Sequence, residues 1–299
     1  MDFTAAVYGA LPRDVVEPPA GARQVSPLIP GSADLAELPD ASLDEAALLA
    51  PPGAVEARYT LALALKALRP GGLLTAAAPK DRGGLRLKKT LQTFGCTVDE
   101  TSRRHHRICV ARRPAEVTGL EAALAEGGPR QLGEFWSQPG VFSWDRLDPG
   151  SALLLRHLPA LAGAGADFGC GVGVLAKAVL TSPQVRRLVG VDIDRRAIAA
   201  ARRNVEDPRA EFLWADVRHA GLTDLDFVVM NPPFHEAGAE DKGLGQAFIR
   251  TAAGSLRKGG TLRLVANRHL PYEAVLQEAF ASVAPVADEA GFKVYEARR

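Results

Sequence analysis

Cysteine is scarce in this sequence. The 299 residues include three cysteines, Cys96, Cys109 and Cys170. Their number is odd and no two of them have the CxxC spacing of a zinc site, which argues against a disulfide framework and against a structural metal. We therefore expect buried or incidental thiols and no metal site.

Long hydrophobic runs are also absent. No apolar stretch approaches the roughly 20 residues that a membrane-spanning helix needs. The opening MDFTAAVYGA has an acidic residue where a signal peptide would have a basic segment. The composition, 47% hydrophobic and 24% charged, is that of an ordinary globular protein. We expect a soluble cytoplasmic protein without membrane contact, and the length favours two domains.

The formal net charge is only +1, but the charges are unevenly distributed. Residues 1–56 hold nine acidic and two basic side chains, whereas residues 80–113 hold ten basic and three acidic ones. The second stretch fits either a solvated helix face or a site for nucleic-acid phosphates. Its candidate RNA-binding residues are Lys80, Arg82, Arg86, Lys88, Lys89, Arg103, Arg104 and Arg107.

From about residue 165, short apolar runs alternate with amphipathic helical patterns. Strands are predicted at residues 166–169, 186–193, 210–214, 225–230, 261–266 and 292–297, and helices at 196–205, 245–256 and 272–280. Such βαβ alternation predicts an α/β fold with a mostly parallel sheet and helices on both faces. Ligands of these sheets bind beyond the carboxyl ends of the strands.

The first half repeats features of the second in the same order. The segment LRPGGLL at 68–74 corresponds to LRKGGTL at 256–262, and ARR at 111–113 corresponds to ARR at 297–299. The segment LLAPPG at 48–53 corresponds to VMNPPF at 229–234. These matches predict two tandem, Rossmann-like domains that arose by duplication, in residues 1–125 and 126–299.

The first copy lacks the chemistry of the second. Ala50 and Gly53 replace the Asn and Phe of the NPPF corner, and no glycine-rich turn precedes residue 50. We therefore expect a degenerate N-terminal copy with a structural or RNA-binding role.

A glycine-rich turn, DFGCGVG, occupies residues 167–173. Gly169, Gly171 and Gly173 allow the backbone to approach a ligand closely, and the turn leads into the apolar helical pattern VLAKAVL. The spacing is not the strict GxGxxG of dinucleotide-binding proteins.

Two aspartates follow this turn at the ends of successive strands. Asp192, which ends the next strand, is placed to bind the two ribose hydroxyls of a nucleoside. Asp216 follows the strand after it and can accept a hydrogen bond from an adenine amino group. Each aspartate alone also fits a helix cap or a turn.

The NPPF corner at 231–234 ends a predicted buried strand. The side-chain carbonyl of Asn231 and the backbone carbonyl of Pro232 can converge on one amino group, and the two prolines fix their orientation. Phe234 offers a ring on which a planar base can stack. The alternative is an Asx-turn with a purely structural role.

The residues from about 134 onward resemble the class I S-adenosylmethionine-dependent methyltransferases, and in particular the ribosomal RNA guanine-N2 methyltransferase family RsmC. The motifs that carry the resemblance are PGVFSWDRLDPGSALLL (139–155), DFGCGVG, NPPFH (231–235), GGTLRLVANRHLPY (259–272) and FKV (292–294). Members of this family are also similar to this chain in having a degenerate N-terminal copy.

The resemblance implies a role for each candidate residue. Asp167, Gly169, Gly171 and Gly173 would surround the amino-acid end of S-adenosylmethionine, with Asp192 at the ribose and Asp216 at the adenine. Asn231, which lies beside the cofactor, would hold the target guanine together with Pro232 and Phe234. Phe142 and Ser151 match the stretch that closes over the cofactor. His235 matches the family pattern as either a catalytic or a loop histidine.

The expected reaction is methyl transfer to N2 of a guanine in small-subunit ribosomal RNA, with the RNA or the small ribosomal subunit as partner. We expect a monomer whose domains form an intramolecular pseudo-dimer. The alternatives are a methyltransferase for large-subunit guanine-N2, for adenine-N6 or for protein glutamine, and a non-catalytic RNA-binding protein.

Overall fold

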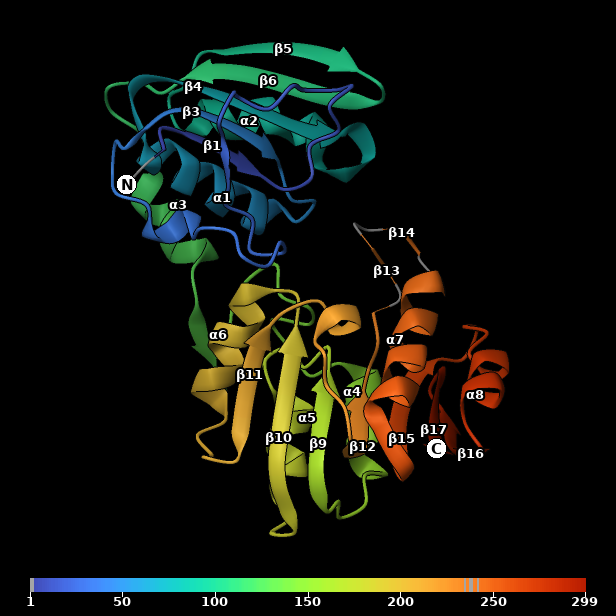
Figure 1. Cartoon of the computed structure of the whole chain (residues 1–299). Helices are drawn as coiled ribbons and strands as arrows, with labels where there is room; N and C mark the ends of the chain where they lie inside the picture. The colour runs from blue at the N-terminus through green and yellow to red at the C-terminus, as the bar shows by residue number, and fades with distance from the viewer. Residues whose placement is uncertain (1–2, 234, 237–238, 241) are drawn as a thin grey trace. The chain divides into compact units, whose positions relative to one another are not determined.

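The computed structural model describes residues 3–233, 235–236, 239–240 and 242–299. The chain divides into two compact units (Figure 1). Unit 1 comprises Met1–Pro129 and Gln138–Gly140, and unit 2 comprises Arg130–Ser137 and Val141–Arg299.

Unit 2 is built on a seven-stranded sheet with the strand order β11-β10-β9-β12-β15-β17-β16. The first five strands in this order are parallel, and β17 pairs antiparallel with both β15 and β16. The strands are β9 (Gly163–Phe168), β10 (Val185–Asp192), β11 (Ala210–Trp214), β12 (Leu225–Met230), β15 (Leu256–Asn267), β16 (Ser282–Glu289) and β17 (Phe292–Arg298). Two short hairpins lie outside this sheet, β7 (Arg130–Leu132) with β8 (Phe135–Ser137) and β13 (His235–Glu236) with β14 (Ala239–Glu240).

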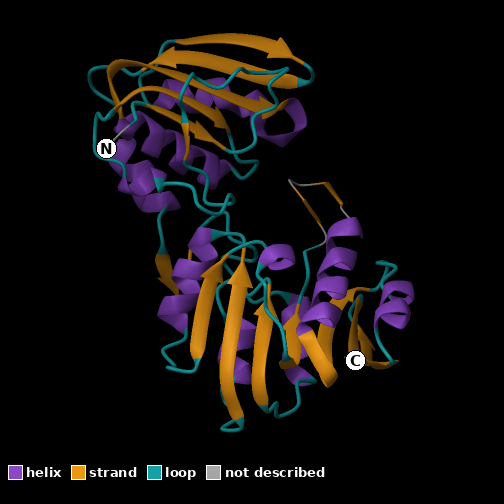
Figure 2. Cartoon of the chain, in the orientation of Figure 1, coloured by secondary structure: helices purple, strands orange, loops and turns teal. Residues whose placement is uncertain are grey.

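Helices cover both faces of this sheet (Figure 2). One face packs against α4 (Pro149–Arg156), α5 (Val174–Val179) and α6 (Arg195–Asn204), and the other against α7 (Lys242–Ser255), α8 (Glu273–Ala279) and the 3-10 turn η3 (Val217–His219). Side chains of β12 alternate between the two cores, because Phe227 and Val229 face α4–α6 whereas Val228 and Met230 face α7 and α8. The predicted α/β fold and each predicted element of this half are confirmed. Helix α4, the turn η3, strand β16 and the β7–β8 and β13–β14 hairpins were not predicted.

Unit 1 contains a six-stranded sheet in the order β2-β1-β3-β4-β6-β5. Its strands are β1 (Ala5–Tyr8), β2 (Arg23–Gln24), β3 (Leu43–Leu49), β4 (Leu68–Pro79), β5 (Val98–Arg103) and β6 (His106–Arg112). Its helices are α1 (Ala54–Ala67), α2 (Leu85–Thr93) and α3 (Leu120–Gly127), with the short turns η1 (Leu35–Glu37) and η2 (Lys80–Gly84). The strand order equals that of unit 2 without a counterpart of β11. Helix α3 spans residue 125, where the sequence predicted the end of the first domain.

The repeated LRxGG segment has the same structure in both units. It begins a twelve-residue strand, β4 or β15, with the same sequence of buried and exposed positions. Gly71 and Gly259 have φ values of +80° and +78°, which favour glycine. At the next residue, Gly72 or Gly260, a Cβ atom would meet a backbone carbonyl at 2.9 Å. Both glycines of the motif are therefore required by the backbone.

The repeated ARR segment has a structural role as well. The backbone of Arg113 pairs with Gly71 and Gly72, as that of Arg299 pairs with Gly259 and Gly260. The guanidinium of Arg113 donates to the carbonyl of Leu65 in α1, and that of Arg299 donates to the carbonyl of Ala253 in α7. Each arginine thus satisfies a carbonyl near the end of a helix.

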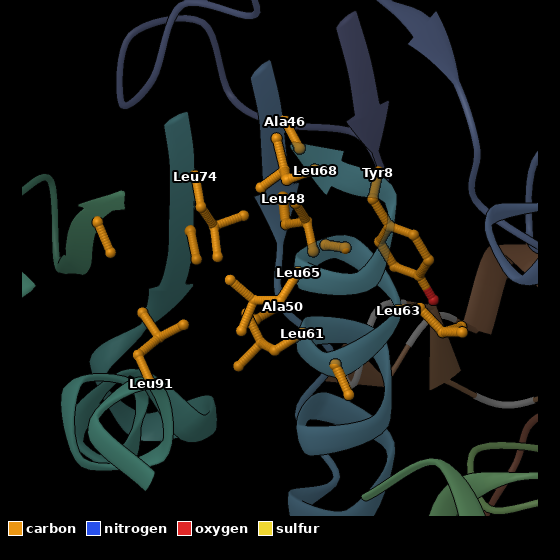
Figure 3. Packing of buried hydrophobic residues seen from close by; sticks show 14 of the residues in the cluster. Tyr8, Ala46, Leu48, Ala50, Leu61, Leu63, Leu65, Leu68, Leu74 and Leu91 are labelled. Carbon is orange, nitrogen blue, oxygen red and sulfur yellow. The ribbon is translucent and has the colours of Figure 1, made fainter. Parts of the chain in front are cut away.

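Unit 1 has lost the helices of one face. No helix lies between Tyr8 and Arg23, and a loop with Leu11, Val15 and Val16 packs against the face that corresponds to the α4–α6 face of unit 2. The sequence repeat aligned Ala50 with Asn231, but the strand register is offset by one residue: Ala47 lies opposite Thr75 of β4 as Val229 lies opposite Arg263 of β15, so Leu49 is the counterpart of Asn231. Ala50 is buried in the opposite core with Leu61 and Leu65 (Figure 3). Unit 1 therefore retains the sheet and, in α1 and α2, the counterparts of α7 and α8. It lacks counterparts of α4, α5 and α6, and with them the glycine-rich turn that precedes α5.

Two glycines of unit 2 give a matched test of its packing. A Cβ atom on Gly165 in β9 would lie 2.2 Å from the buried ring of Phe227, whereas one on Gly254 in α7 would meet nothing within 4 Å. We expect Gly165→Ala to destabilise the protein by about 1–3 kcal/mol. Gly254→Ala should stabilise it by about 0.5–1 kcal/mol. Chemical denaturation measures both; equal effects would contradict this packing.

Across the residues that the structure describes, no helix is both long and apolar enough to cross a membrane.

Candidate active site

The predicted site residues of unit 2 gather at one edge of its sheet. Strands β11, β10, β9 and β12 are adjacent and parallel. Their carboxyl ends lead to Asp216, Asp192, the 167–173 turn and Asn231, respectively. The structure thus brings together residues that are up to 64 positions apart in the sequence (231 minus 167).

The glycine-rich turn connects β9 to α5 with three residues in the left-handed region. Gly169, Gly171 and Gly173 have φ values of +72°, +52° and +87°. A Cβ atom on Gly173 would lie 3.0 Å from Val205, so close contact with α6 also requires glycine there. A Cβ atom on Gly171 would meet nothing within 4 Å, so that backbone is open to a ligand.

Asp192 holds this turn in place. Its carboxylate accepts hydrogen bonds from the backbone N–H of Gly171 at 2.8 Å and from that of Asp194 at 2.9 Å. Partial burial raises the pKa of Asp192 to about 6, although these N–H groups favour the charged form. Near pH 7 the group is mostly ionised and keeps lone pairs for further donors.

Asp167 is fully buried, and neither carboxylate oxygen has a hydrogen-bond partner of normal geometry among the described residues. Burial is the main cause that raises the pKa of this carboxyl to about 8, and the negative charge of Asp192 adds to it, while the backbone N–H of Ala176 opposes the shift. An unpaired buried carboxyl group near the end of a central strand lowers the stability of the fold. A positively charged group bound nearby would be stabilised by it.

The raised pKa of Asp167 predicts a pH-dependent stability. The folded protein retains this proton above pH 4, where the unfolded chain loses it, so this contribution to stability decreases as the pH rises from about 4 to about 8. We expect Asp167→Asn to stabilise the cofactor-free protein by about 1–3 kcal/mol at pH 8 and by much less at pH 5. Thermal unfolding at both pH values measures this.

Asp207 provides the control. The side chain and backbone of Arg209 lower its pKa, so Asp207→Asn should destabilise the protein at pH 8. Stabilisation by both substitutions, or by neither, would contradict the assignment of the pH effect to Asp167.

Asp216 caps the short turn η3. Its carboxylate accepts from the backbone N–H of Arg218 at 2.9 Å and pairs with the guanidinium of the same residue at 2.6 Å. The Arg218 side chain keeps the pKa of Asp216 below its usual range. Asp216 is thus a cap, one of the two roles that the sequence allowed. Its contact with an adenine stays a prediction.

Asn231 follows β12 directly and is held by α4. Its Nδ2 atom donates to Asp148 Oδ2 at 2.8 Å and to Ser151 Oγ at 3.0 Å. Pro232 is buried next to it. Phe234 lies outside the described residues, as does the side chain of His235.

Two residues of the site were missed from the sequence. Asp148 caps α4, and the DPGS segment is a helix-start signal that could have revealed it. Asn204 donates to the carbonyls of Val172 and Trp136 at 2.8 and 2.9 Å, which ties the glycine-rich turn to the β7–β8 hairpin. No sequence signal identifies that second contact. Ser151 contacts Asn231 and Phe142 is 59% exposed; the predicted place of both residues over the cofactor stays a prediction.

The predicted RNA-binding residues all lie in unit 1, on η2, α2 and the β5–β6 hairpin. Four of them have partners within the protein, among them Arg82. Arg104 pairs with Asp14 at 2.8 Å, Arg107 donates to Ser102 at 3.0 Å, and Arg86 donates to the carbonyl of Pro52 at 3.0 Å. Lys80, Lys89 and Arg103 are exposed and Lys88 is half-buried, and none of the four makes an ion pair within the described chain.

Comparisons with known proteins agree with this geometry. The model of the methyltransferase small domain family matches residues 133–296. The ribosomal RNA small subunit methyltransferase C of Pseudomonas putida strain KT2440 is 36% identical over 276 residues, which cover 88% of this chain and 81% of that protein. The enzyme of the same name from Pseudomonas paraeruginosa strain PA7 is 38% identical over 252 residues, covering 81% of this chain and 75% of that protein.

A solved structure is similar over nearly the whole chain. It is the T. thermophilus 16S rRNA N2 G1207 methyltransferase (RsmC) in complex with AdoMet and guanosine, with a TM-score of 0.78 and 26% identity, covering 99% of this chain and 88% of that one. The chain therefore belongs to the ribosomal RNA small subunit methyltransferase C family.

Proposed function

We propose that this protein transfers a methyl group from S-adenosylmethionine to the exocyclic N2 of a guanine in small-subunit ribosomal RNA. The observation that carries the proposal is the row of side chains at adjacent strand ends, with the glycine-rich turn and Asp192 on one side and Asn231 on the other. The target that we expect is the nucleotide corresponding to G1207, which the T. thermophilus protein modifies.

The residues present fit the cofactor. The open backbone at Gly171, the acceptors of Asp192 and the unpartnered carboxylate of Asp167 suit a ligand that carries a ribose and positive charge. S-adenosylmethionine supplies, when bound, a methyl group on a sulfonium that becomes a neutral thioether on transfer. Asp167 and the glycine-rich turn would hold the amino-acid end, with Asp192 at the ribose and Asp216 at the adenine.

The role of the NPPF corner follows from the chemistry of the guanine amine. The lone pair of an aromatic amine is delocalised into the ring, which makes the nitrogen a poor nucleophile. In our proposal Asn231 Oδ1 and the carbonyl of Pro232 accept the two N–H groups, orient the lone pair and stabilise positive charge on nitrogen as its bond to the methyl carbon forms. The nitrogen then loses one proton to solvent. Phe234 would stack on the base, which must be unpaired or flipped out.

Nucleoside mass spectrometry of ribosomal RNA tests this proposal in cells. Deleting the gene should remove one N2-methylguanosine from small-subunit RNA, and the intact protein should restore it. Loss of a large-subunit N2-methylguanosine, an N6-methyladenosine or a methylglutamine would favour the corresponding alternative. Unchanged modifications would favour a non-catalytic RNA-binding protein.

We also propose that unit 1 binds RNA phosphates while unit 2 performs the chemistry, in a cytoplasmic monomer whose two units form an intramolecular pseudo-dimer. Lys80, which precedes α2, and Lys89, within α2, are exposed and make no ion pair with described residues, which supports the RNA-binding role. Such contacts position RNA without reading its sequence.

Charge reversal of Lys88 and Lys89 tests the binding role. We expect Lys88→Glu with Lys89→Glu to weaken binding to small subunits roughly 10-fold or more and to flatten its salt dependence, because fewer phosphates are neutralised. Lys258→Glu is the control, since this exposed lysine follows the start of β15, at the amino ends of the parallel strands. Filter binding at several salt concentrations measures both. Equal affinities for the two variants would remove unit 1 from the binding surface.

A further inference from the structure

The carboxamide of Asn231 is held in one orientation by its neighbours. Its Nδ2 atom has two hydrogens, and both have acceptors, Asp148 Oδ2 at 2.8 Å and Ser151 Oγ at 3.0 Å. An ionised carboxylate can only accept hydrogen bonds, so the reversed amide would bring Asn231 Oδ1 against a negative oxygen. This leaves Oδ1 as the end of the amide that is available to a donor.

The acceptor itself is rigidly placed. Asp148 is the N-cap of α4, where its Oδ2 also accepts from the backbone N–H of Ser151 at 2.7 Å. Leu153 and Leu154 bury this helix in the sheet core. A Cβ atom on Gly150 would lie 3.0 Å from both Asp148 Oδ2 and the ring of Phe292, so the helix start fits closely between β17 and the Asn231 corner.

The carboxylate also changes the electronic character of the amide. A negative charge beside the N–H group favours the resonance form with more negative charge on the amide oxygen, and hydrogen bonds in series strengthen one another. A more negative Oδ1 is a better acceptor for an amine that gains positive charge. Orientation and polarisation thus act in the same direction.

We propose that Asp148 is a positioning residue for methyl transfer, which acts through Asn231 by presenting and polarising its Oδ1 atom toward the amino group of the substrate. This inference rests on the proposed function. It assigns to the family stretch 139–155 a task in handling the target base, beyond closing over the cofactor.

Two substitutions of Asp148 separate its contact with Asn231 from its role as the N-cap of α4. Asp148→Ser keeps an N-cap residue but has no acceptor long enough to reach Asn231, whereas Asp148→Ala loses both. We expect both variants to lower kcat about 10²-fold, with Kd for S-adenosylmethionine within twofold of wild type, and only Asp148→Ala to lower Tm. Asp224→Asn, which removes an exposed charge at the amino end of β12, away from the site, should leave kcat unchanged. A kcat for Asp148→Ser within twofold of wild type would overturn the proposal.

Two further measurements make the result specific. In an Asn231→Ala background, Asp148→Ser should lower kcat no further, because both changes remove one interaction; additive losses would contradict the proposal. The side-chain amide protons of Asn231, followed by NMR without substrate, should lose their protection from exchange in Asp148→Ser. Unchanged protection would also overturn it. If wild-type protein shows no methyl transfer, the proposed function fails, and the NMR result still decides the orientation of Asn231.

Discussion

Replacing Asn231 with alanine should reduce methyl transfer by about 10³-fold while leaving the affinity for S-adenosylmethionine within about twofold of wild type. The substitution removes the acceptor that orients the amine and leaves the glycine-rich turn and Asp192 in place. Loss of a single preorganised polar group at a reacting centre typically costs 10²–10³-fold in rate. Single-turnover kinetics with small ribosomal subunits measures the rate, and calorimetry measures the affinity.

Asn231→Ala also leaves the cap of α4 intact, since Asp148 still accepts from the backbone of Ser151. We therefore expect the variant to fold normally. Unchanged turnover would exclude Asn231 from the mechanism, and an equal loss of rate and cofactor affinity would move its role to cofactor binding.

Replacing Asp192 with alanine should weaken cofactor binding by at least about 10²-fold. The change removes a charged acceptor for the ribose, worth about 1.5–3 kcal/mol, and also releases the backbone N–H of Gly171 from its present partner. For the intact protein, affinity should decrease as the pH falls through about 6, where Asp192 gains a proton. Titration calorimetry at pH 5 and pH 7.5 measures both effects.

Asp207→Ala is the matched control, because Asp207 also accepts from a backbone N–H two residues ahead but does so at the start of β11, away from the site. Its cofactor affinity should equal that of wild type. Equal affinities for Asp192→Ala and wild type would refute the ribose assignment.

Much of the fold could be predicted from local patterns. The period-2 alternation in β12 reflects packing requirements that act over a few residues. The LRxGG and ARR segments make contacts over longer distances in the sequence, 48 residues from Arg113 and 46 from Arg299, but they are recognisable because each occurs twice. The repeats were detected because Gly72 and Gly260 meet the same steric limit, and Arg113 and Arg299 satisfy the same kind of carbonyl. Such requirements are visible in a single sequence.

Contacts between distant segments could not be predicted in this way. Asp148 and Asn231 are 83 residues apart, and Arg104 and its partner Asp14 are 90 residues apart (104 minus 14). Only the folded structure shows that Asp148 bonds to the side-chain amide of Asn231 and that Asp14 pairs with Arg104 of the basic stretch. The glycine turn and the strand-end acids were predicted because parallel topology places all carboxyl ends at one edge.

The proposed role of Asn231, directing a methyl group to N2 of guanine, can be tested directly. The most direct measurement incubates purified protein and small ribosomal subunits with isotopically labelled S-adenosylmethionine, then digests the RNA to nucleosides for mass spectrometry. We predict label in N2-methylguanosine at one position with wild-type protein, and about 10³-fold less with Asn231→Ala. Label in any other nucleoside or in protein, or equal labelling by the two proteins, would contradict the account.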